Sequence, residues 1–214
     1  MVKVIELNNA VEKNFLCKIF VERLSGLTTT YQHAINSYTF FPEINRKILD
    51  SLIDKGKVVK SRNLLELTEE GRRSLAIVMC GGTFDIIHPG HISTLKSAKS
   101  FGDVLIVVVA TDGTVERTKG RKPHNSENKR FELVSSLKFV DLALIGQRES
   151  IYDSLLKIKP NYVVLGYDQT HKEEEIRNFA INNKMKLKVI RLTEKVEGVK
   201  SSSLLKDKTI INET

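Results

Sequence analysis

The chain has 214 residues, more than one average domain and less than two large ones, of which 41% are hydrophobic and 28% charged. This composition is ordinary for a globular protein and argues against a disordered, collagen-like or coiled-coil chain. The net charge of +8 suggests a polyanionic partner, but the basic residues are spread along the chain and do not identify it.

The sequence lacks the features of an exported or membrane protein. No apolar run approaches the roughly 18–20 residues that span a bilayer, and the first fifteen residues contain acidic side chains and no apolar signal segment. The two cysteines, Cys17 and Cys80, lie far apart and form no CxxC motif. This usage is typical of a reducing compartment and argues against a disulfide framework or a zinc ribbon. We therefore expect a cytoplasmic protein without a membrane partner.

The first 75 residues predict a small domain of helices and one hairpin. Apolar residues at helical spacing predict a helix over Val11–Leu24 and another over Ile44–Leu52, with Pro42 before it and Gly56 after it. A weaker helix is expected over residues 28–36.

A hairpin and a capped helix complete this region. The apolar stretches 58–59 and 64–67 flank the polar tip Ser61-Arg62-Asn63, which predicts two strands with an irregular turn. Thr68, followed by two acids, predicts the start of a last helix. Three helices, a hairpin and a helix is the order of a winged helix-turn-helix, and the region resembles the winged-helix domains of prokaryotic regulators.

This resemblance implies that the helix over 44–55 is a recognition helix and that residues 61–63 form the wing tip. Acidic and basic side chains balance on that helix, however, whereas duplex binding usually needs a basic surplus. Two interpretations of residues 1–75 therefore stay open: a DNA-binding domain, and a dimerisation or docking module on the same fold.

From residue 76 the pattern changes to alternating strands and helices. Continuous apolar runs predict strands at 76–80 and 104–110, and weaker runs predict strands at 142–145, 162–165 and 187–190. Helical stretches at 91–100, 127–137, 151–158 and 172–183 lie between them. The alternation predicts an α/β domain over 76–214 with a Rossmann-like, doubly wound parallel sheet. Ligands bind such sheets beyond the carboxyl ends of the strands, where the strand order reverses.

The loop after the first of these strands carries the strongest chemical signal. It reads GGTFDIIHPGH from Gly81 to His91. Glycines at a strand end allow close approach of a ligand, and the two histidines, His88 and His91, lie where a helix would begin and offer N–H groups to an anion. Imidazoles at this place can stabilise charge on a phosphoryl group.

The histidine pair has two plainer interpretations. One is a turn histidine followed by a helix-capping histidine, which is the usual meaning of an isolated HxxH. The other is a zinc site, but no cysteine or glutamate ligand lies nearby. The position after the first strand of a parallel sheet, and the length of the string GTFDxxHxGH, favour a phosphate-binding role, and no protein-held metal is expected.

The string GTFDIIHPGH resembles the signature of the HxGH nucleotidyltransferases, the superfamily of cytidylyltransferases and small adenylyltransferases. The resemblance covers roughly residues 76–206. Within it, the stretch VATDGTVERTKGRKPHNSENKR, the tetrapeptide LGYD at 165–168 and the late serines are most similar to the archaeal FAD synthases.

The resemblance implies a role for residues in several loops. The catalytic groups would be His88, His91, Lys119 and Arg130, with Lys119 on the loop after the second strand and Arg130 facing phosphate from the following helix. The nucleotide would be bound by Gly82, Thr83, Phe84, His88, His91, Gly166, Asp168, Ser201, Ser202 and Ser203. The acceptor would be bound by Asp112 and Arg121.

One departure from the family pattern leaves a role open. The compact Arg-Thr-Glu-Gly that precedes the Ser-Thr run in cytidylyltransferases is stretched here over residues 191–198. Arg191, Lys195 and Lys200 are therefore three candidates for the position of its arginine.

The leading hypothesis is an enzyme that transfers AMP from ATP to FMN, giving FAD and pyrophosphate. A Mg²⁺ or another divalent ion would be held by substrate oxygens, and the family implies a homodimer. The alternatives are a CTP-dependent cytidylyltransferase acting on glycerol 3-phosphate or a similar phosphorylated alcohol, and a transcriptional regulator that senses a nucleotide or flavin.

Overall fold

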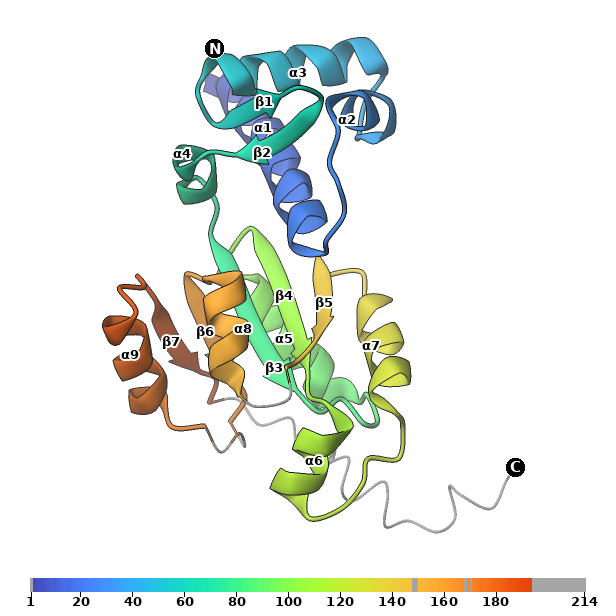
Figure 1. Ribbon diagram of the computed structural model, residues 1–214, viewed down its shortest axis with the longest axis vertical. Coiled ribbons are helices and arrows are strands. Elements are labelled where there is room, and N and C mark those ends of the chain that lie inside the picture. Colours follow the sequence, from blue (N-terminus) through green and yellow to red (C-terminus); the bar gives the residue numbers. More distant parts are fainter. Residues whose placement is uncertain (1, 148–149, 168, 170, 194–214) are drawn as a thin grey trace, which may run out of the picture. The chain divides into compact units, whose positions relative to one another are not determined.

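The structure is a computed structural model that describes residues 2–147, 150–167, 169 and 171–193 (Figure 1). The chain divides into two compact units, residues 1–76 and residues 77–214. Within the part of the chain just given, each helix is too short or too polar to cross a membrane.

The first unit contains helices and one antiparallel hairpin. In chain order these are α1 (Val2–Leu24), α2 (Tyr31–Ser37), α3 (Pro42–Asp54), β1 (Val58–Ser61), β2 (Leu64–Leu67) and α4 (Glu69–Arg73). The starts of α2, α3 and α4 have local causes. Pro42 is the first residue of α3, and the hydroxyls of Thr30 and Thr68 accept hydrogen bonds from backbone N–H groups of the first turns of α2 and α4.

The apolar stripes of these helices form the core of the unit. Phe15 and Ile19 of α1 and Leu49 and Leu52 of α3 are fully buried, and Leu65 of β2 is buried with them. The order of elements is the one expected for this region, while its assignment to the winged-helix fold stays a prediction.

The hairpin turn is tighter than the sequence suggested. Ser61 belongs to β1 and pairs with Leu64, so Arg62 and Asn63 alone make the turn. Arg62 adopts a left-handed backbone with φ of 56°, which two-residue hairpin turns require and which side chains other than glycine rarely favour.

The second unit is built around a five-stranded parallel sheet in the order β5-β4-β3-β6-β7. Its strands are β3 (Ile77–Gly82), β4 (Val104–Val109), β5 (Leu142–Ile145), β6 (Tyr162–Leu165) and β7 (Lys188–Arg191). Its helices are α5 (Pro89–Lys99), α6 (Asp112–Lys119), α7 (Glu127–Ser135), α8 (Ile151–Ile158) and α9 (Glu173–Asn182). The chain runs outward from β3 to β5 and then returns to β6 on the other side of β3, so the strand order reverses at β3.

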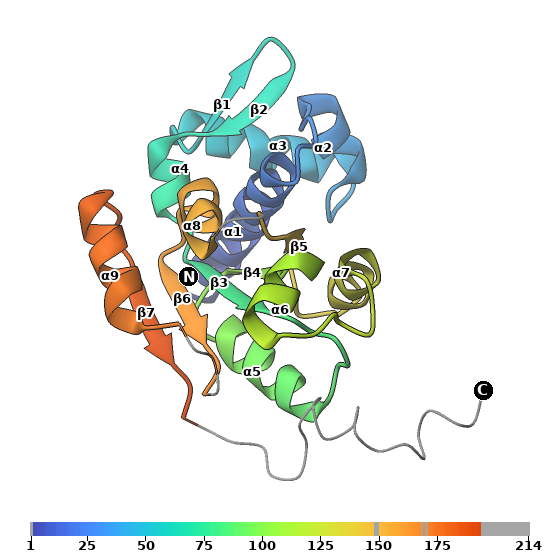
Figure 2. The ribbon, with the colours of Figure 1, turned by 60° about the horizontal axis from the view of Figure 1, so that its bottom comes forward.

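Burial of the central strands explains their continuous apolar runs. All six residues of β4 and the first four of β3 are buried, because helices cover the sheet on both faces. Figure 2 shows α5 and α8 on opposite sides of the sheet. The predicted α/β class with a doubly wound parallel sheet is confirmed.

One helix was missed. Residues 112–119 form α6, whereas the sequence analysis placed Lys119 on a loop after the second strand. The hydroxyl of Thr111 accepts a hydrogen bond from the backbone N–H of Thr114, and Gly120 ends the helix in a left-handed conformation with φ of 65°. Lys119 is thus the last residue of a helix, where a cation is favoured by the helix dipole.

Candidate active site

The candidate site lies where the central strand β3 ends, at the point where the strand order reverses. Gly81 and Gly82 close β3, and after a short loop α5 begins at Pro89 with His88 at its N-cap position. The backbone N–H of His91 donates to the carbonyl of His88 over 2.9 Å, which forms the first turn of the helix. The positive end of the helix dipole thus faces this loop.

The two predicted histidines lie side by side at this helix start. The ring centroids of His88 and His91 are 3.9 Å apart with 34° between the ring planes, and both side chains are partly exposed. The ring of Phe84 packs against His91 with the centroids 5.3 Å apart. The structure therefore brings both imidazoles to one place at the edge of the sheet where a ligand would bind.

Two glycines make room for these rings. A Cβ at Gly90 would lie 3.0 Å from two atoms of the His88 ring, and a Cβ at Gly82 would lie 2.8 Å from the Phe84 ring. Phe84 is buried and has a left-handed backbone with φ of 54°. Strain of this kind is retained at sites where the surrounding structure fixes it, and here it turns the chain from β3 toward the histidines.

Asp85 is a residue of the motif for which the sequence analysis gave no role. Its carboxylate is buried and accepts hydrogen bonds from the backbone N–H groups of His124 (2.8 Å) and Asn125 (3.0 Å), and from Nη1 of Arg121 (3.2 Å). Burial alone would raise the pKa of Asp85, but the three donors outweigh it and hold that pKa below its usual range. Asp85 thus fastens the segment before α7 to the histidine loop.

Arg130 lies differently from the expected phosphate-facing side chain. It is fully buried, and its guanidinium donates to the carbonyls of Thr83 (2.6 Å) and Asn125 (2.9 Å) and to Oδ1 of Asp112 (2.6 Å). Burial of a guanidinium is tolerated when its donors are satisfied in this way. Arg130 therefore supports the loop that carries Thr83 and Phe84 from within.

The two expected acceptor residues take part in the same framework. Asp112 is about half exposed and pairs with Arg130, while its backbone N–H donates to Glu127 over 2.7 Å. Nη1 of Arg121 reaches Asp85 and also the carbonyl of Lys122 (3.0 Å). Lys119 is exposed at the end of α6.

A second loop, residues 166–171, follows β6 on the other side of β3. Gly166 is buried at its start, and Nε2 of Gln169 donates to the carbonyl of Gly81 over 2.5 Å. Arg191 at the end of β7 donates to three carbonyls of this loop. The predicted Asp168, Ser201, Ser202 and Ser203, and the candidates Lys195 and Lys200, lie outside the described residues.

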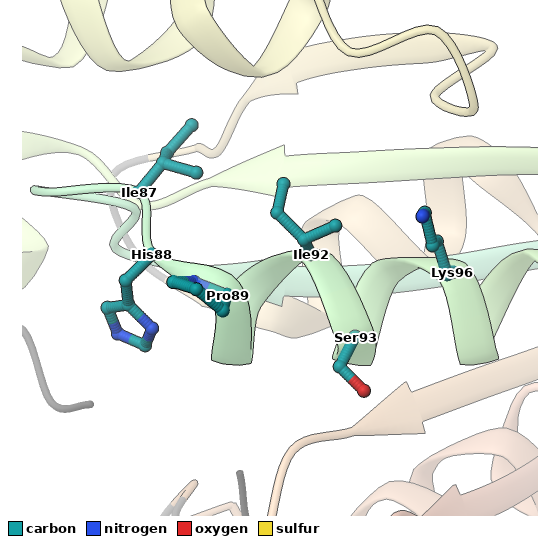
Figure 3. Close-up of a pocket in the computed structure, with 6 residues that line it drawn as sticks. All are labelled: Ile87, His88, Pro89, Ile92, Ser93 and Lys96. Carbon is teal, nitrogen blue, oxygen red and sulfur yellow. The ribbon is translucent and has the colours of Figure 1, made fainter. Parts of the chain in front are cut away.

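A groove of about 540 Å³ begins beside His88 and follows α5 (Figure 3). Figure 3 shows Ile87 and Ile92 pointing to one side of the helix, and His88 and Ser93 to the other. The residues that line the groove are Ile87, His88, Pro89, Ile92, Ser93 and Lys96. Its size is within the range of small-molecule sites.

Neither a covalent nucleophile nor a metal cage stands out in the residues that the structure describes. Cys80 is buried in β3, and burial raises the pKa of its thiol to about 12 while a backbone hydrogen bond from Gly81 lowers it slightly. No group of three or more potential metal ligands is found among these residues.

Comparison with known proteins places the second unit in a family. Residues 79–208 match the family model described as cytidylyltransferase-like. An FAD synthase of Aciduliprofundum boonei is 45% identical over 115 residues, which are 54% of this chain and 76% of that protein. An FAD synthase of Thermoplasma volcanium is 39% identical over 131 residues, 61% of this chain and 92% of that protein.

A solved structure agrees with the fold of this unit. The crystal structure described as the lipopolysaccharide core biosynthesis protein from Thermoplasma volcanium is 38% identical, with a TM-score of 0.55. The match covers 57% of this chain and 99% of that one. Its description names a different process from FAD synthesis.

Proposed function

Because the chain belongs to the cytidylyltransferase-like family, we propose that it transfers AMP from ATP to FMN, giving FAD and pyrophosphate. The adjacent pair His88 and His91 at the start of α5 is the observation that carries the nucleotidyl transfer. The likeness to FAD synthases at 39–45% identity supports ATP and FMN as the substrates.

The reaction needs positioning and charge stabilisation, because phosphoryl groups carry most of the charge in the transition state. A phosphate oxygen of FMN attacks the α-phosphorus of ATP and forms the new P–O bond. The bond from the α-phosphorus to the bridging oxygen breaks, and pyrophosphate leaves with the electron pair. Nitrogen–hydrogen groups of His88 and His91, with the N–H groups at the start of α5, donate to the oxygens whose charge increases.

Nucleotide and acceptor are assigned to opposite sides of β3. Gly166 and Asp168 would lie beside the nucleobase and ribose, and the serines at 201–203 would bind the β- and γ-phosphates, as the family resemblance implies. Asp112, Arg121 and Lys119 lie on or beside α6, on the acceptor side. Arg121 is bound to Asp85, and Lys119 is exposed at the end of α6.

Nucleotidyltransferases of this kind usually use a divalent metal. Such an ion would be held mainly by substrate oxygens. Such an ion would neutralise charge on the triphosphate when it is bound. The chain's own contribution is the positioning of the triphosphate by the helix start and the histidine pair.

A substrate panel tests the proposal. ATP and CTP are each offered with FMN, glycerol 3-phosphate and phosphocholine in the presence of Mg²⁺, and pyrophosphate release is measured. The proposal predicts turnover with ATP and FMN alone. Turnover with CTP and glycerol 3-phosphate instead would establish the cytidylyltransferase alternative. Nucleotide or flavin binding without turnover would favour the regulator.

The first unit is proposed to bind duplex DNA through α3 and the hairpin, with docking to another protein as the competing outcome. Arg46 and Lys47 on α3 and Arg62 at the hairpin turn are exposed, while the carboxylate of Asp50 is bound by the hydroxyl of Tyr31. A mobility shift that weakens with salt and is lost in Arg46→Glu would support DNA binding. The matched change Arg73→Glu on α4 would leave it unchanged, and no shift with either chain would favour docking.

We also expect a homodimer, as the family resemblance implies, and a cytoplasmic location, as the sequence suggested. Sedimentation equilibrium of the full chain tests the first: a single species of twice the chain mass supports it, and a monomer at all concentrations rejects it.

A further inference from the structure

Arg191 is the described member of the three basic residues that are candidates for the position of the family's arginine before the serine run. It is the last residue of β7, where it pairs in register with Leu165, the last residue of β6. Its side chain is about one-quarter exposed. From this place it reaches across the end of β6 to the 166–171 loop.

The guanidinium of Arg191 is occupied by the protein itself. Nη1 donates to the carbonyls of Gly166 and Gln169, each over 3.0 Å, and Nη2 donates to the carbonyl of His171 over 2.6 Å. Nε donates to Oε1 of Glu173 over 2.8 Å. These four hydrogen bonds engage four of the five N–H groups that an arginine has, so a two-point contact with a phosphate would require breaking some of them.

The contacts of Arg191 hold the described residues that follow β6. The carbonyls of Gly166, Gln169 and His171 all turn toward this one side chain, which fixes the backbone at these three residues. The loop is attached at its other side to β3, because Gln169 donates to the carbonyl of Gly81, one residue before Gly82. The loop is thereby held between the end of β7 and the strand that leads to the histidines.

We infer that Arg191 is a positioning residue of the nucleotide subsite, which holds the backbone of Gly166, Gln169 and His171 in the form that receives the nucleobase and ribose, and that it does not bind the phosphates. This inference rests on the proposed function, because the loop is a nucleotide subsite only if the second unit binds a nucleoside triphosphate. A preformed loop lowers the ordering cost of binding. Loss of Arg191 therefore weakens nucleotide binding more than it slows the chemical step.

The chain offers a matched control. Arg177 on α9 donates to the other carboxylate oxygen of Glu173 over 2.9 Å and to the carbonyl of Val189, and among the described residues none of its hydrogen bonds reaches Gly166, Gln169 or His171. Arg177→Ala therefore removes an arginine from the same ion-pair network without releasing the loop. Arg191→Lys keeps the charge but replaces the planar fork by a single ammonium group, which cannot reach all of these acceptors at once.

The experiment measures ATP affinity by titration calorimetry without FMN, and kcat and both KM values by pyrophosphate release. Arg191→Ala is expected to raise the ATP Kd and the ATP KM about tenfold, with kcat and the FMN KM within about threefold of the original chain. Arg191→Lys is expected to give ATP Kd and KM values between those of Arg191→Ala and those of the original chain. Arg177→Ala is expected to give the values of the original chain. If Arg191→Ala fails to fold, the same ATP-specific change in Arg191→Lys decides the question.

Three results would overturn the inference. One is an unchanged ATP Kd in Arg191→Ala; another is a fall in kcat at constant ATP KM, which would mean direct contact with the reacting phosphates. The third is an equal loss in Arg191→Ala and Arg177→Ala. Failure of the proposed function is distinguishable from these three results. It would appear as the absence of turnover by the unaltered chain, whereas the ATP titration of the same chain still reports on Arg191.

Discussion

Nη2 of Arg130 lies 2.6 Å from Oδ1 of Asp112, so the first residue of α6 is paired with a fully buried arginine of α7. The same guanidinium holds the carbonyls of Thr83 and Asn125. Three segments that are far apart in the sequence meet at this one side chain. The histidine loop, the start of α6 and the segment before α7 are therefore fixed as one framework around the candidate site.

Arg130→Met is expected to destabilise the protein by about 3–5 kcal/mol, because it leaves two carbonyls and a carboxylate without their donor. Urea unfolding measures the change. Lys129→Met, the exposed neighbour on the same helix, serves as the control and should stay within about 0.5 kcal/mol of the original chain. Equal stabilities for the two variants would contradict the structural role given to Arg130.

Asp85 gives the stability a defined pH dependence. Because its pKa in the folded protein lies below that of an unfolded aspartate, its contribution is complete above the unfolded value of about 4 and is lost as pH falls toward the folded value. Asp85→Asn should therefore be less stable than the original chain at pH 7, and the difference should shrink below about pH 4. Urea unfolding of both chains between pH 3 and 7 measures this difference in the free energy of unfolding. A difference that stays constant with pH would exclude the Asp85 carboxylate as the source of the pH dependence.

A side chain at Gly90 is predicted to disturb the His88 ring, because its Cβ would lie very close to that ring. In Gly90→Ala the new Cβ would lie 3.0 Å from the His88 ring and push it away from His91, so kcat should fall by roughly tenfold or more. Gly113→Ala in α6 is the matched control, since nothing lies within 4 Å of its Cβ and alanine favours a helix. Equal kcat values for Gly90→Ala and Gly113→Ala would contradict this prediction.

The thiol of Cys80 is expected to be inert in the folded protein. With a pKa raised to about 12 and no exposure in β3, it should resist a maleimide at pH 8 and react only after unfolding. The measurement uses a Cys17→Ser chain, so that Cys80 is the single thiol. Labelling of the native chain within minutes would show that β3 opens.

The sequence predicted what short-range patterns encode. Continuous apolar runs located all five strands of the sheet, and the contiguous motif located His88 and His91, because residues three apart at a helix start share one place. The α6 helix could also have been found, since Thr111 and Gly120 are a capping pair at helical distance. It was missed because the polar sequence between them resembles a loop.

The remaining features depend on contacts between distant residues. Asp85 binds backbone groups about 40 residues away, and no local pattern announces that partnership. Arg130 has the sequence position of a phosphate-facing residue, but the direction of its side chain is set by three acceptors on separate segments. Arg191 is likewise explained only by the folded loop that it holds.

The central claim concerns the histidine pair, and the turnover of His91→Ala tests it most directly. With saturating ATP, FMN and Mg²⁺, the account predicts that kcat for pyrophosphate release falls by at least about a hundredfold. The thermal unfolding midpoint should stay close to that of the original chain. Turnover at the original rate by a folded His91→Ala chain would contradict the account.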